Sequence, residues 1–261
     1  MSKPRVVAFI QARLTSSRLP NKVLERIGPW TAIELMTLRL SRAKCLDDII
    51  FVIPDTESND PLDIYLRETL KSKVVRGSED DVLGRFTCAM KLHEADYYVR
   101  LTADCPLICP ELVDDVVNLA VGQKLAYATN TNPPTFPDGF DVECVSREAL
   151  TWTTTHVKNP HWREHVTYGL RESPERPETF KFGNVTQDGP SASWMRMTLD
   201  TPEDLAMLRE FHSISGSHLE FAAHDFLQSM YQSESLFRFN SQHKRNEGFH
   251  LSAQKLSHLN K

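Results

Sequence analysis

The sequence predicts an α/β fold, a doubly wound and mostly parallel sheet with helices on both faces. Short β-branched apolar runs alternate five times with stretches whose apolar residues recur at the helical period. No internal repeat and no linker rich in glycine or serine interrupts this alternation. A chain of 261 residues, 40% hydrophobic and 25% charged, has the composition of a globular protein. Strand–helix–strand units of this kind build parallel sheets with right-handed crossovers.

The first half of the chain carries the regular alternation. The run VVAFIQ is short and β-branched and predicts a buried strand. Pro61 suits the first turn of a helix, and Ser78 with Asp81 resembles a capping arrangement for another. The expected elements are strand 6–11, helix 32–43, strand 48–53, helix 61–70, strand 73–76, helix 80–93, strand 97–102, helix 110–121 and strand 125–129.

The second half is less regular. Its expected elements are strand 141–146, helix 147–155, helix 163–172, strand 180–185, strand 195–199 and helix 202–211. Thr201-Pro202 is a typical start for the last helix. Beyond about residue 213 the apolar pattern fades. We therefore expect one domain over 1–212 and a helical C-terminal extension over 213–261.

Composition and charge exclude several classes of protein. The 30 Lys and Arg against 35 Asp and Glu leave a net charge of −5, which argues against a bulk electrostatic interaction with nucleic acid. No apolar run approaches the ~18–20 residues that span a bilayer, and the first residues do not resemble a signal peptide. Five scattered cysteines speak against a disulfide framework. We expect a cytoplasmic protein without a nucleic-acid or membrane partner.

The segment after the first strand carries the strongest chemical signal. It follows the carboxyl end of a buried strand, where open α/β sheets bind ligands. The segment contains two arginines, a lysine and three hydroxyl side chains, a combination that suits the binding of a polyphosphate. A solvated basic loop without a ligand is the alternative. The glycine-rich patterns of P-loop NTPases and dinucleotide-binding enzymes are absent. The residues concerned are Arg13, Thr15, Ser16, Ser17, Arg18 and Lys22.

Two aspartates end expected strands that are far apart in the sequence. Asp104 lies just past the strand over 97–102, and Asp200 ends the one over 195–199. Both would then lie at the same rim of the sheet and could share one metal ion. One or two carboxylates together with substrate phosphates suit Mg²⁺. Each aspartate alone could instead be a turn or cap residue.

Six motifs, in this order along the chain, resemble one family. The segment over 10–24 is similar to the signature of the cytidylyltransferases that activate acidic sugars, such as CMP-Kdo and CMP-sialic acid synthetases. Five more segments narrow the resemblance to the branch named for spore coat polysaccharide biosynthesis protein F: 76–83, 102–107, 136–143, 163–167 and 199–204. The resemblance covers about residues 4–212. It departs from the family at Asn21 and Ala103, where glycine is common.

The resemblance implies a nucleotide-diphospho-sugar transferase fold and an enzyme that transfers CMP from CTP to a sugar for a surface polysaccharide or glycan, releasing pyrophosphate. The implied nucleotide-binding residues are Gln11, Ala12, Arg13, Ser17, Arg18, Lys22, Arg76 and Asp104. Asp104 and Asp200 would hold Mg²⁺. The implied acceptor-side residues are Asp138, Asp141, Glu143, Glu164 and His165. Of all these, Arg13, Lys22, Asp104 and His165 would take part in catalysis.

The residue types agree with in-line attack of an acceptor oxygen on the α-phosphorus. His165 is the candidate general base, since an ordinary pKa of ~6.5 suits proton removal near neutrality; a histidine packed on a helix is the alternative. The acidic segment 138–143 favours a polyhydroxylated or amino-bearing sugar over a strongly anionic one. Open alternatives are a sugar-1-phosphate nucleotidyltransferase that uses another NTP, and a non-catalytic nucleotide-binding protein on the same fold.

The resemblance also implies a homodimer. Aromatic side chains concentrate in the second half of the chain and agree with an interface, although a core would use them equally well. These aromatic residues are Trp152, Trp162, Tyr168, Phe180, Phe182 and Trp194.

Overall fold

A computed structural model describes residues 3–215, 221, 222, 225, 227, 228, 234–245 and 247. Its strands are β1 (Val6–Gln11), β2 (Arg26–Ile27), β3 (Trp30–Thr31), β4 (Asp48–Pro54), β5 (Lys73–Gly77), β6 (Tyr97–Thr102), β7 (Tyr127–Thr129), β8 (Glu143–Ser146) and β9 (Phe182–Asn184). Its α-helices are α1 (Ala32–Leu40), α2 (Asp60–Ile64), α3 (Val82–Leu92), α4 (Pro110–Gly122), α5 (Arg147–His156), α6 (Pro160–Glu164), α7 (Tyr168–Glu172) and α8 (Pro202–Ser215). Shorter helical turns are η1 (Lys22–Leu24), η2 (Glu57–Asn59), η3 (Tyr65–Thr69) and η4 (Glu234–Arg238).

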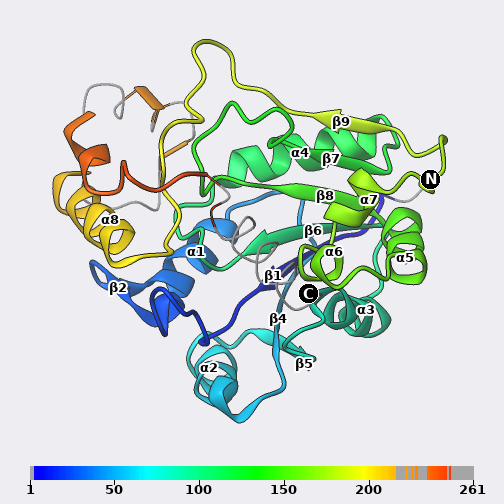
Figure 1. Ribbon diagram of the computed structural model, residues 1–261, viewed down its shortest axis with the longest axis horizontal. Coiled ribbons are helices and arrows are strands. Elements are labelled where there is room, and N and C mark those ends of the chain that lie inside the picture. Colours follow the sequence, from blue (N-terminus) through cyan, green and yellow to red (C-terminus); the bar gives the residue numbers. More distant parts are fainter. Residues whose placement is uncertain are drawn as a thin grey trace, which may run out of the picture.

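Seven strands form one sheet in the order β5–β4–β1–β6–β8–β7–β9 (Figure 1). Only β8 runs antiparallel to its neighbours, and every other pairing in this sheet is parallel. The predicted mostly parallel sheet is confirmed. The small β2–β3 hairpin lies outside this sheet and was not predicted. Its turn contains Gly28 with a φ of +62°, a conformation that glycine adopts without strain.

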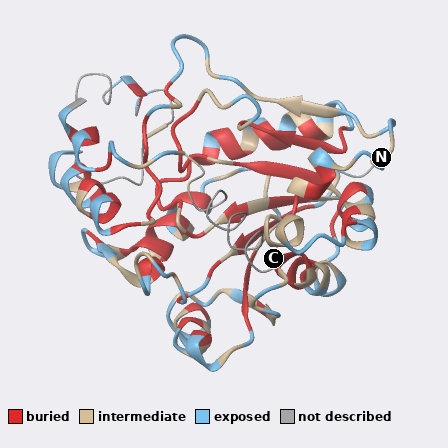
Figure 2. Ribbon diagram, in the orientation of Figure 1, coloured by how far each residue is buried: buried red, intermediate tan, exposed pale blue. Residues whose placement is uncertain are grey.

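Helices cover both faces of the sheet because side chains alternate along each strand. In β1, Val6, Ala8 and Ile10 join the apolar cluster that includes α1, α4 and α8. Val7 and Phe9 join the cluster on the other face, with α3, α5 and α7. Figure 2 shows the resulting buried strands between half-exposed helices. This is the doubly wound arrangement that the alternation predicts.

The expected helix over 163–172 is wrong. The structure has two short helices there, α6 and α7, because Val166 between them takes a positive φ of 49°. A β-branched residue rarely adopts this conformation, so the sequence pattern did not reveal the break. The interruption turns the end of α6 toward the carboxyl ends of the strands.

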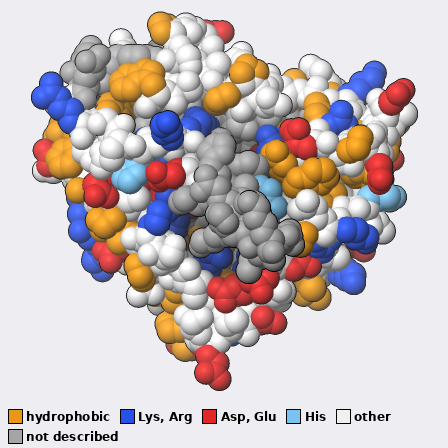
Figure 3. All heavy atoms as spheres, in the orientation of Figure 1, with side chains coloured by type: hydrophobic (Ala, Val, Ile, Leu, Met, Phe, Trp, Pro, Cys, Tyr) orange, Lys and Arg blue, Asp and Glu red, His pale blue; other side chains and the backbone are white. Residues whose placement is uncertain are grey.

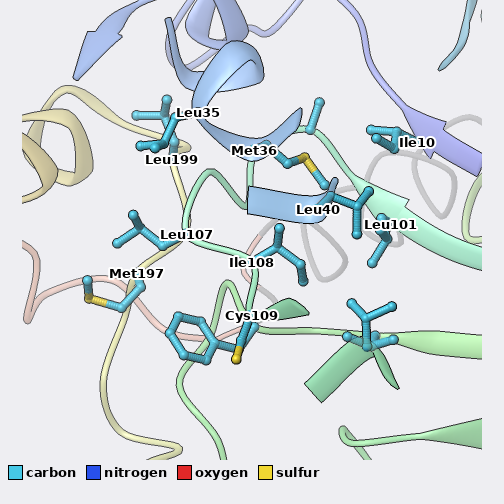
Figure 4. Packing of buried hydrophobic residues seen from close by; sticks show 14 of the residues in the cluster. Ile10, Leu35, Met36, Leu40, Leu101, Leu107, Ile108, Cys109, Met197 and Leu199 are labelled. Atoms are coloured by element: carbon cyan, nitrogen blue, oxygen red, sulfur yellow. The ribbon is translucent and has the colours of Figure 1, made fainter. Parts of the chain in front are cut away.

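The expected strand over 195–199 is also wrong, but its residues are held almost as a strand would be. Only an isolated bridge between Asp138 and Arg196 forms there. The backbone N–H of Leu199 donates to the carbonyl of Asp104 at 2.7 Å. The Leu199 side chain belongs to the same buried apolar cluster as Leu35 and Leu107, drawn in Figure 4. This packing fixes the residue that follows, Asp200.

The predicted division at residue 212 remains untested, because much of 213–261 lies outside the described residues. The parts that are described return to the main domain. Asn240 is buried, and its side-chain amide donates to the carbonyl of Arg196 at 3.1 Å. Among the described residues, no helix is both long and apolar enough to cross a membrane. On the face drawn in Figure 3, acidic and basic side chains are interspersed.

Candidate active site

A cavity of about 1070 Å³ opens at the carboxyl ends of β1 and β6, the rim at which open α/β sheets bind ligands. The predicted site residues that line it are Gln11, Ala12, Arg13, Ser17, Arg18, Lys22, Asp104, Asp138, Asp141, Glu143, Glu164, His165 and Asp200. The structure does not bring Arg76 to this cavity. Its guanidinium instead pairs with Asp60 at 2.6 Å and donates to the carbonyl of Thr56 at 3.0 Å. Arg76 therefore holds the chain between β4 and α2.

Lys22 lies between the two strand-end aspartates. Its Nζ is 2.7 Å from Oδ2 of Asp104 and 2.7 Å from Oδ1 of Asp200. Burial lowers the pKa of Lys22, but the attraction of both carboxylates outweighs burial and leaves this pKa raised. Burial has the opposite effect on Asp104 and raises its pKa. The attraction of Lys22 outweighs the effect of burial and lowers the pKa of Asp104 to about 2. Lys22 and Asp104 therefore both stay charged near neutral pH.

Local backbone geometry brings this lysine to the rim. Asn21 has φ 59° and ψ 17°, the left-handed conformation that asparagine tolerates better than most residues. Lys22 then begins η1 and turns back under the loop. The departure from glycine at position 21 is therefore accommodated by the backbone.

Arg196 organises the surroundings of Asp200. Its Nη2 is 3.2 Å from Oδ2 of Asp200, its Nη1 is 3.0 Å from Oδ2 of Asp138, and its Nε is 2.8 Å from Oδ1 of Asp204. Asp204, in the first turn of α8, is fully buried. Asn240 also donates to it, at 2.9 Å. One guanidinium thus connects the predicted metal ligand with the predicted acceptor side.

The two aspartates fit a hard divalent cation. Oδ2 of Asp104 and Oδ1 of Asp200 approach one point, which the Nζ of Lys22 takes. Mg²⁺ is typically held by one or two carboxylates together with substrate phosphates, and this donor set meets that description. A bound cation would displace Lys22 from its place between the carboxylates and leave its ammonium available to the phosphates.

Glu143 is the most fully satisfied carboxylate of the acceptor end. It pairs with Arg100 and accepts hydrogen bonds from the hydroxyls of Tyr127 and Thr167, both at 2.5 Å. Burial would raise its pKa, but Arg100 and Arg171 outweigh burial and lower the pKa to about 2. Glu143 is therefore ionised, and its charge is balanced within the protein.

Asp138 and Asp141 are also paired with arginines. Arg196 holds Asp138, and Arg245 holds Asp141 while donating to the carbonyl of Phe136 at 3.0 Å. Burial and the neighbouring Asp141 raise the pKa of Asp138 to about 7, against the opposing effect of the two arginines. Asp138 can therefore take up or release a proton near neutral pH.

His165 lines the cavity, but the argument for it as a general base does not hold. Burial, Arg100 and His161 lower its pKa to about 3, so its imidazole binds a proton weakly. Its ring lies 4.8 Å from that of His161, centre to centre. His161, Glu164 and His165 also bring one potential metal-ligand atom each within 4.8 Å of one another. We assign none of the three to proton transfer.

Sequence reasoning missed most of the arginines and the whole contribution of the tail. The missed residues that line the cavity or contact its walls are Arg85, Arg100, Arg171, Arg196, Arg245 and Glu247. Glu247 pairs with Nη1 of Arg18 at 2.9 Å, and Nη2 of Arg18 pairs with Asp200 at 3.0 Å. The run KRNEG over 244–248, which holds charged residues of both signs, was the available signal for the tail.

The chain belongs to the cytidylyltransferase family, because residues 7–244 match the model of that family. It is therefore a nucleotidyltransferase enzyme. This match favours neither a sugar-1-phosphate nucleotidyltransferase nor a non-catalytic protein.

Individual relatives agree with this assignment. Spore coat polysaccharide biosynthesis protein SpsF of Bacillus subtilis is 27% identical over 235 residues, which span 85% of this chain and 92% of SpsF. An uncharacterized protein of Methanocaldococcus jannaschii is 34% identical over 214 residues, 79% of this chain and 82% of that protein. The structure of a cytidylyltransferase from Leptospira borgpetersenii superposes with a TM-score of 0.83 at 29% identity, covering 90% and 97% of the two chains. The predicted SpsF-like branch and nucleotidyltransferase-type fold are confirmed.

Proposed function

We propose that this enzyme transfers CMP from CTP to a sugar acceptor and releases pyrophosphate. The observation that carries the proposal is the Lys22 ammonium between Asp104 and Asp200, at a cavity whose rim is the cationic loop after β1. Two carboxylates that converge on one point suit a metal ion that also binds a phosphate. The cationic loop supplies hydrogen-bond donors for the other phosphates of a triphosphate. Mg²⁺ is the proposed cofactor, and when bound it would polarise the α-phosphate.

In the proposed reaction an acceptor hydroxyl attacks the α-phosphorus in line. The new bond joins the acceptor oxygen to phosphorus, the bond to the β-phosphate oxygen breaks, and pyrophosphate leaves. Asp138 receives the hydroxyl proton, since its carboxylate lines the cavity and its pKa is about 7. Arg196 pairs with both Asp138 and Asp200 and therefore fixes the position of one carboxylate relative to the other. Positioning and charge stabilisation supply the acceleration.

The arrangement of charges at the far end of the cavity supports an acceptor that carries a carboxylate. The acidic segment suggested a polyhydroxylated or amino-bearing sugar, but each of its three carboxylates is paired with an arginine. Arg171 also lines this end, and its Nε is buried without a hydrogen-bond partner. Within the described residues its guanidinium forms no ion pair and lies 5.4 Å from the ring of Tyr168. An unpaired guanidinium is suited to bind an anionic group.

The family resemblance supports three wider proposals. The product would supply a surface polysaccharide or glycan, and the enzyme would work in the cytoplasm, where CTP is available. It would form a homodimer. Of the aromatic residues that suggested an interface, Trp152, Trp162, Phe180 and Phe182 pack against the core, while Trp194 is 52% exposed. Light scattering at micromolar concentration tests the dimer, since a monomer has a mass of 29.8 kDa.

Pyrophosphate release with each of the four NTPs, Mg²⁺ and a panel of sugars tests the reaction. We expect turnover with CTP, and faster turnover with sugar acids than with the neutral or amino sugars of matched size. Turnover with GTP, UTP or ATP alone would contradict CTP as the donor. Turnover only with sugar 1-phosphates would replace the proposed reaction by sugar-1-phosphate nucleotidyl transfer.

A further inference from the structure

Arg85 in α3 is a buried arginine whose guanidinium has no hydrogen-bond or ion-pair partner among the described residues. The residue is 2% exposed, and neither its Nε nor its Nη1 makes a hydrogen bond. Within the described part of the chain no carboxylate comes within the 4.0 Å of an ion pair. Arg85 nevertheless lines the cavity. A buried and unpaired charge opposes folding, so the fold alone does not explain this residue.

A second cation makes the position of Arg85 still less favourable. Burial lowers the pKa of Arg85 to about 10, and Arg13 contributes next in the same direction. Arg13 is an exposed residue of the loop after β1, and within the described residues its side chain has neither a hydrogen bond nor an ion pair. Both arginines line the same cavity, and within the described residues neither of them forms an ion pair.

The carboxylates around Arg85 are engaged elsewhere or exposed. Glu79, Asp55 and Asp81 act on Arg85 in the opposite direction to Arg13. Glu79 accepts a hydrogen bond from the hydroxyl of Thr15, and Asp81 is bound to Arg163 at 2.7 Å. The charge of the two guanidiniums is therefore only partly balanced by the protein.

We propose that Arg85 and Arg13 together bind the terminal phosphates of the nucleoside triphosphate and then the pyrophosphate that the transfer releases. This inference rests on the proposed function and adds a residue to it. Lys22 is occupied by its two aspartates in the free enzyme, whereas Arg13 and Arg85 are available to an anion. Contacts between guanidinium and phosphate oxygens are charge-assisted and bidentate, which suits the two outer phosphates. Gly77 leaves room for this, since a β-carbon there would lie 3.0 Å from Cγ of Arg85.

Arg85→Met tests the proposal by two independent readouts. Methionine keeps the straight stem that packs on Gly77 and removes the unpaired charge. Calorimetric titration with magnesium pyrophosphate, CTP and CMP should show pyrophosphate and CTP bound about 10- to 100-fold more weakly. CMP affinity should stay within about twofold, since CMP lacks the outer phosphates. The melting temperature of the ligand-free variant should rise by about 2–4 °C, because the charge no longer has to be buried.

Arg171→Met at the other end of the same cavity is the matched control and should leave pyrophosphate affinity unchanged. An equal loss of CMP and pyrophosphate affinity would place Arg85 on the nucleoside instead. Unchanged pyrophosphate affinity, or a lower melting temperature with unchanged binding, would make Arg85 structural and overturn the proposal. If the methionine variant does not fold, the ratio of pyrophosphate to CMP affinity in Arg85→Lys decides. Pyrophosphate binding is measured without an acceptor, so a failure to transfer CMP would contradict the proposed function and leave this site intact.

Discussion

The nucleotide end and the acceptor end of the cavity each contain a pair of arginines, and the two pairs differ in whether the protein supplies their counter-charge. At the nucleotide end, Arg13 and Arg85 have no anionic partner in the protein, within the part of the chain that the structure describes. At the acceptor end, Arg100 and Arg245 neutralise carboxylates that would otherwise face the ligand. An arginine at a cavity therefore indicates a site for an anionic ligand only when the protein itself does not neutralise that arginine. The predictions below test this contrast, from the largest expected effect to the smallest.

Removal of the proposed base should have the largest effect. Asp138→Asn keeps the shape and the contact with Arg196 but cannot take a proton, so kcat should fall by about 10²- to 10⁴-fold. In the wild type the base must be deprotonated, so kcat/KM for the acceptor should rise with pH and level off above about pH 7. A rate profile from pH 5.5 to 8.5 measures this. A profile that stays flat in the wild type would exclude Asp138 as the base.

Asp104→Asn and Asp200→Asn should each reduce Mg²⁺-dependent turnover by about 10²-fold, because a misplaced metal or phosphate disturbs the in-line geometry. Asp188→Asn, at an exposed position, is the control and should leave turnover unchanged. Initial rates at limiting Mg²⁺ provide the measurement. A wild-type rate in either site variant would mean that the aspartate concerned is a turn or cap residue and does not bind the metal.

Substitution of Arg13 should affect only nucleotide binding, whereas substitution of Lys22 should affect both nucleotide binding and the stability of the fold. Arg13→Ala should weaken CTP binding about 10- to 100-fold with little change for CMP, and leave the melting temperature unchanged. Lys22→Met should weaken CTP similarly but also destabilise the fold by about 3 kcal/mol or more, because it leaves Asp104 and Asp200 without their shared counter-charge. Titration and thermal melting of both variants measure the difference. Equal melting temperatures would contradict a structural role for the Lys22 ion pairs.

At the acceptor end, Arg171→Lys should raise KM for a sugar acid by about tenfold, because lysine cannot make the bidentate contact with a carboxylate. KM for CTP should not change. Steady-state kinetics with a sugar acid and with its neutral analogue separate the two. An equal rise in KM for the neutral analogue would show that Arg171 maintains the structure of the acceptor end of the cavity and does not bind the carboxylate of the acceptor.

The smallest effect should come from the tail. Glu247 pairs with Arg18, a residue expected to bind the triphosphate, but both side chains are partly exposed, so the contact contributes under ~1 kcal/mol. Glu247→Gln should therefore improve CTP affinity by about two- to fivefold. Titration with CTP at low salt measures the change, and at high salt it should disappear. Weaker CTP binding in the variant would mean that Glu247 positions Arg18 for the nucleotide.

The parts of the fold that are local in sequence could be predicted. Strand–helix alternation in the first half predicted the strands of the main sheet and the helices between them through α4, since both periodicities are read within a few residues, but it did not reveal the β2–β3 hairpin. Val166 has a left-handed conformation imposed by its surroundings, which no pattern reveals. Residues 195–199 look like a strand, but backbone hydrogen bonds to Asp104 and Asp138 replace sheet pairing there.

The same distinction applies to the site. Arg13, Lys22 and Asp104 could be predicted to meet, because β1 and β6 run parallel and end at one rim. Asp200 reaches the same rim although the strand expected before it does not form. The charge state of the acceptor end could not, since the partner of Asp141 lies 104 residues further along the chain. The low pKa of His165 depends on burial beside Arg100, which the sequence of α6 does not contain.

The C-terminal segment has a consequence for how the protein can be divided. Cutting the chain at 212 would leave Asp141 without Arg245, Arg18 without Glu247 and Asp204 without Asn240. A fusion or exchange of modules at that point would therefore change acceptor recognition as well as length. Variation among relatives in this C-terminal segment should therefore follow variation in the residues that it contacts, Arg18, Asp141 and Asp204.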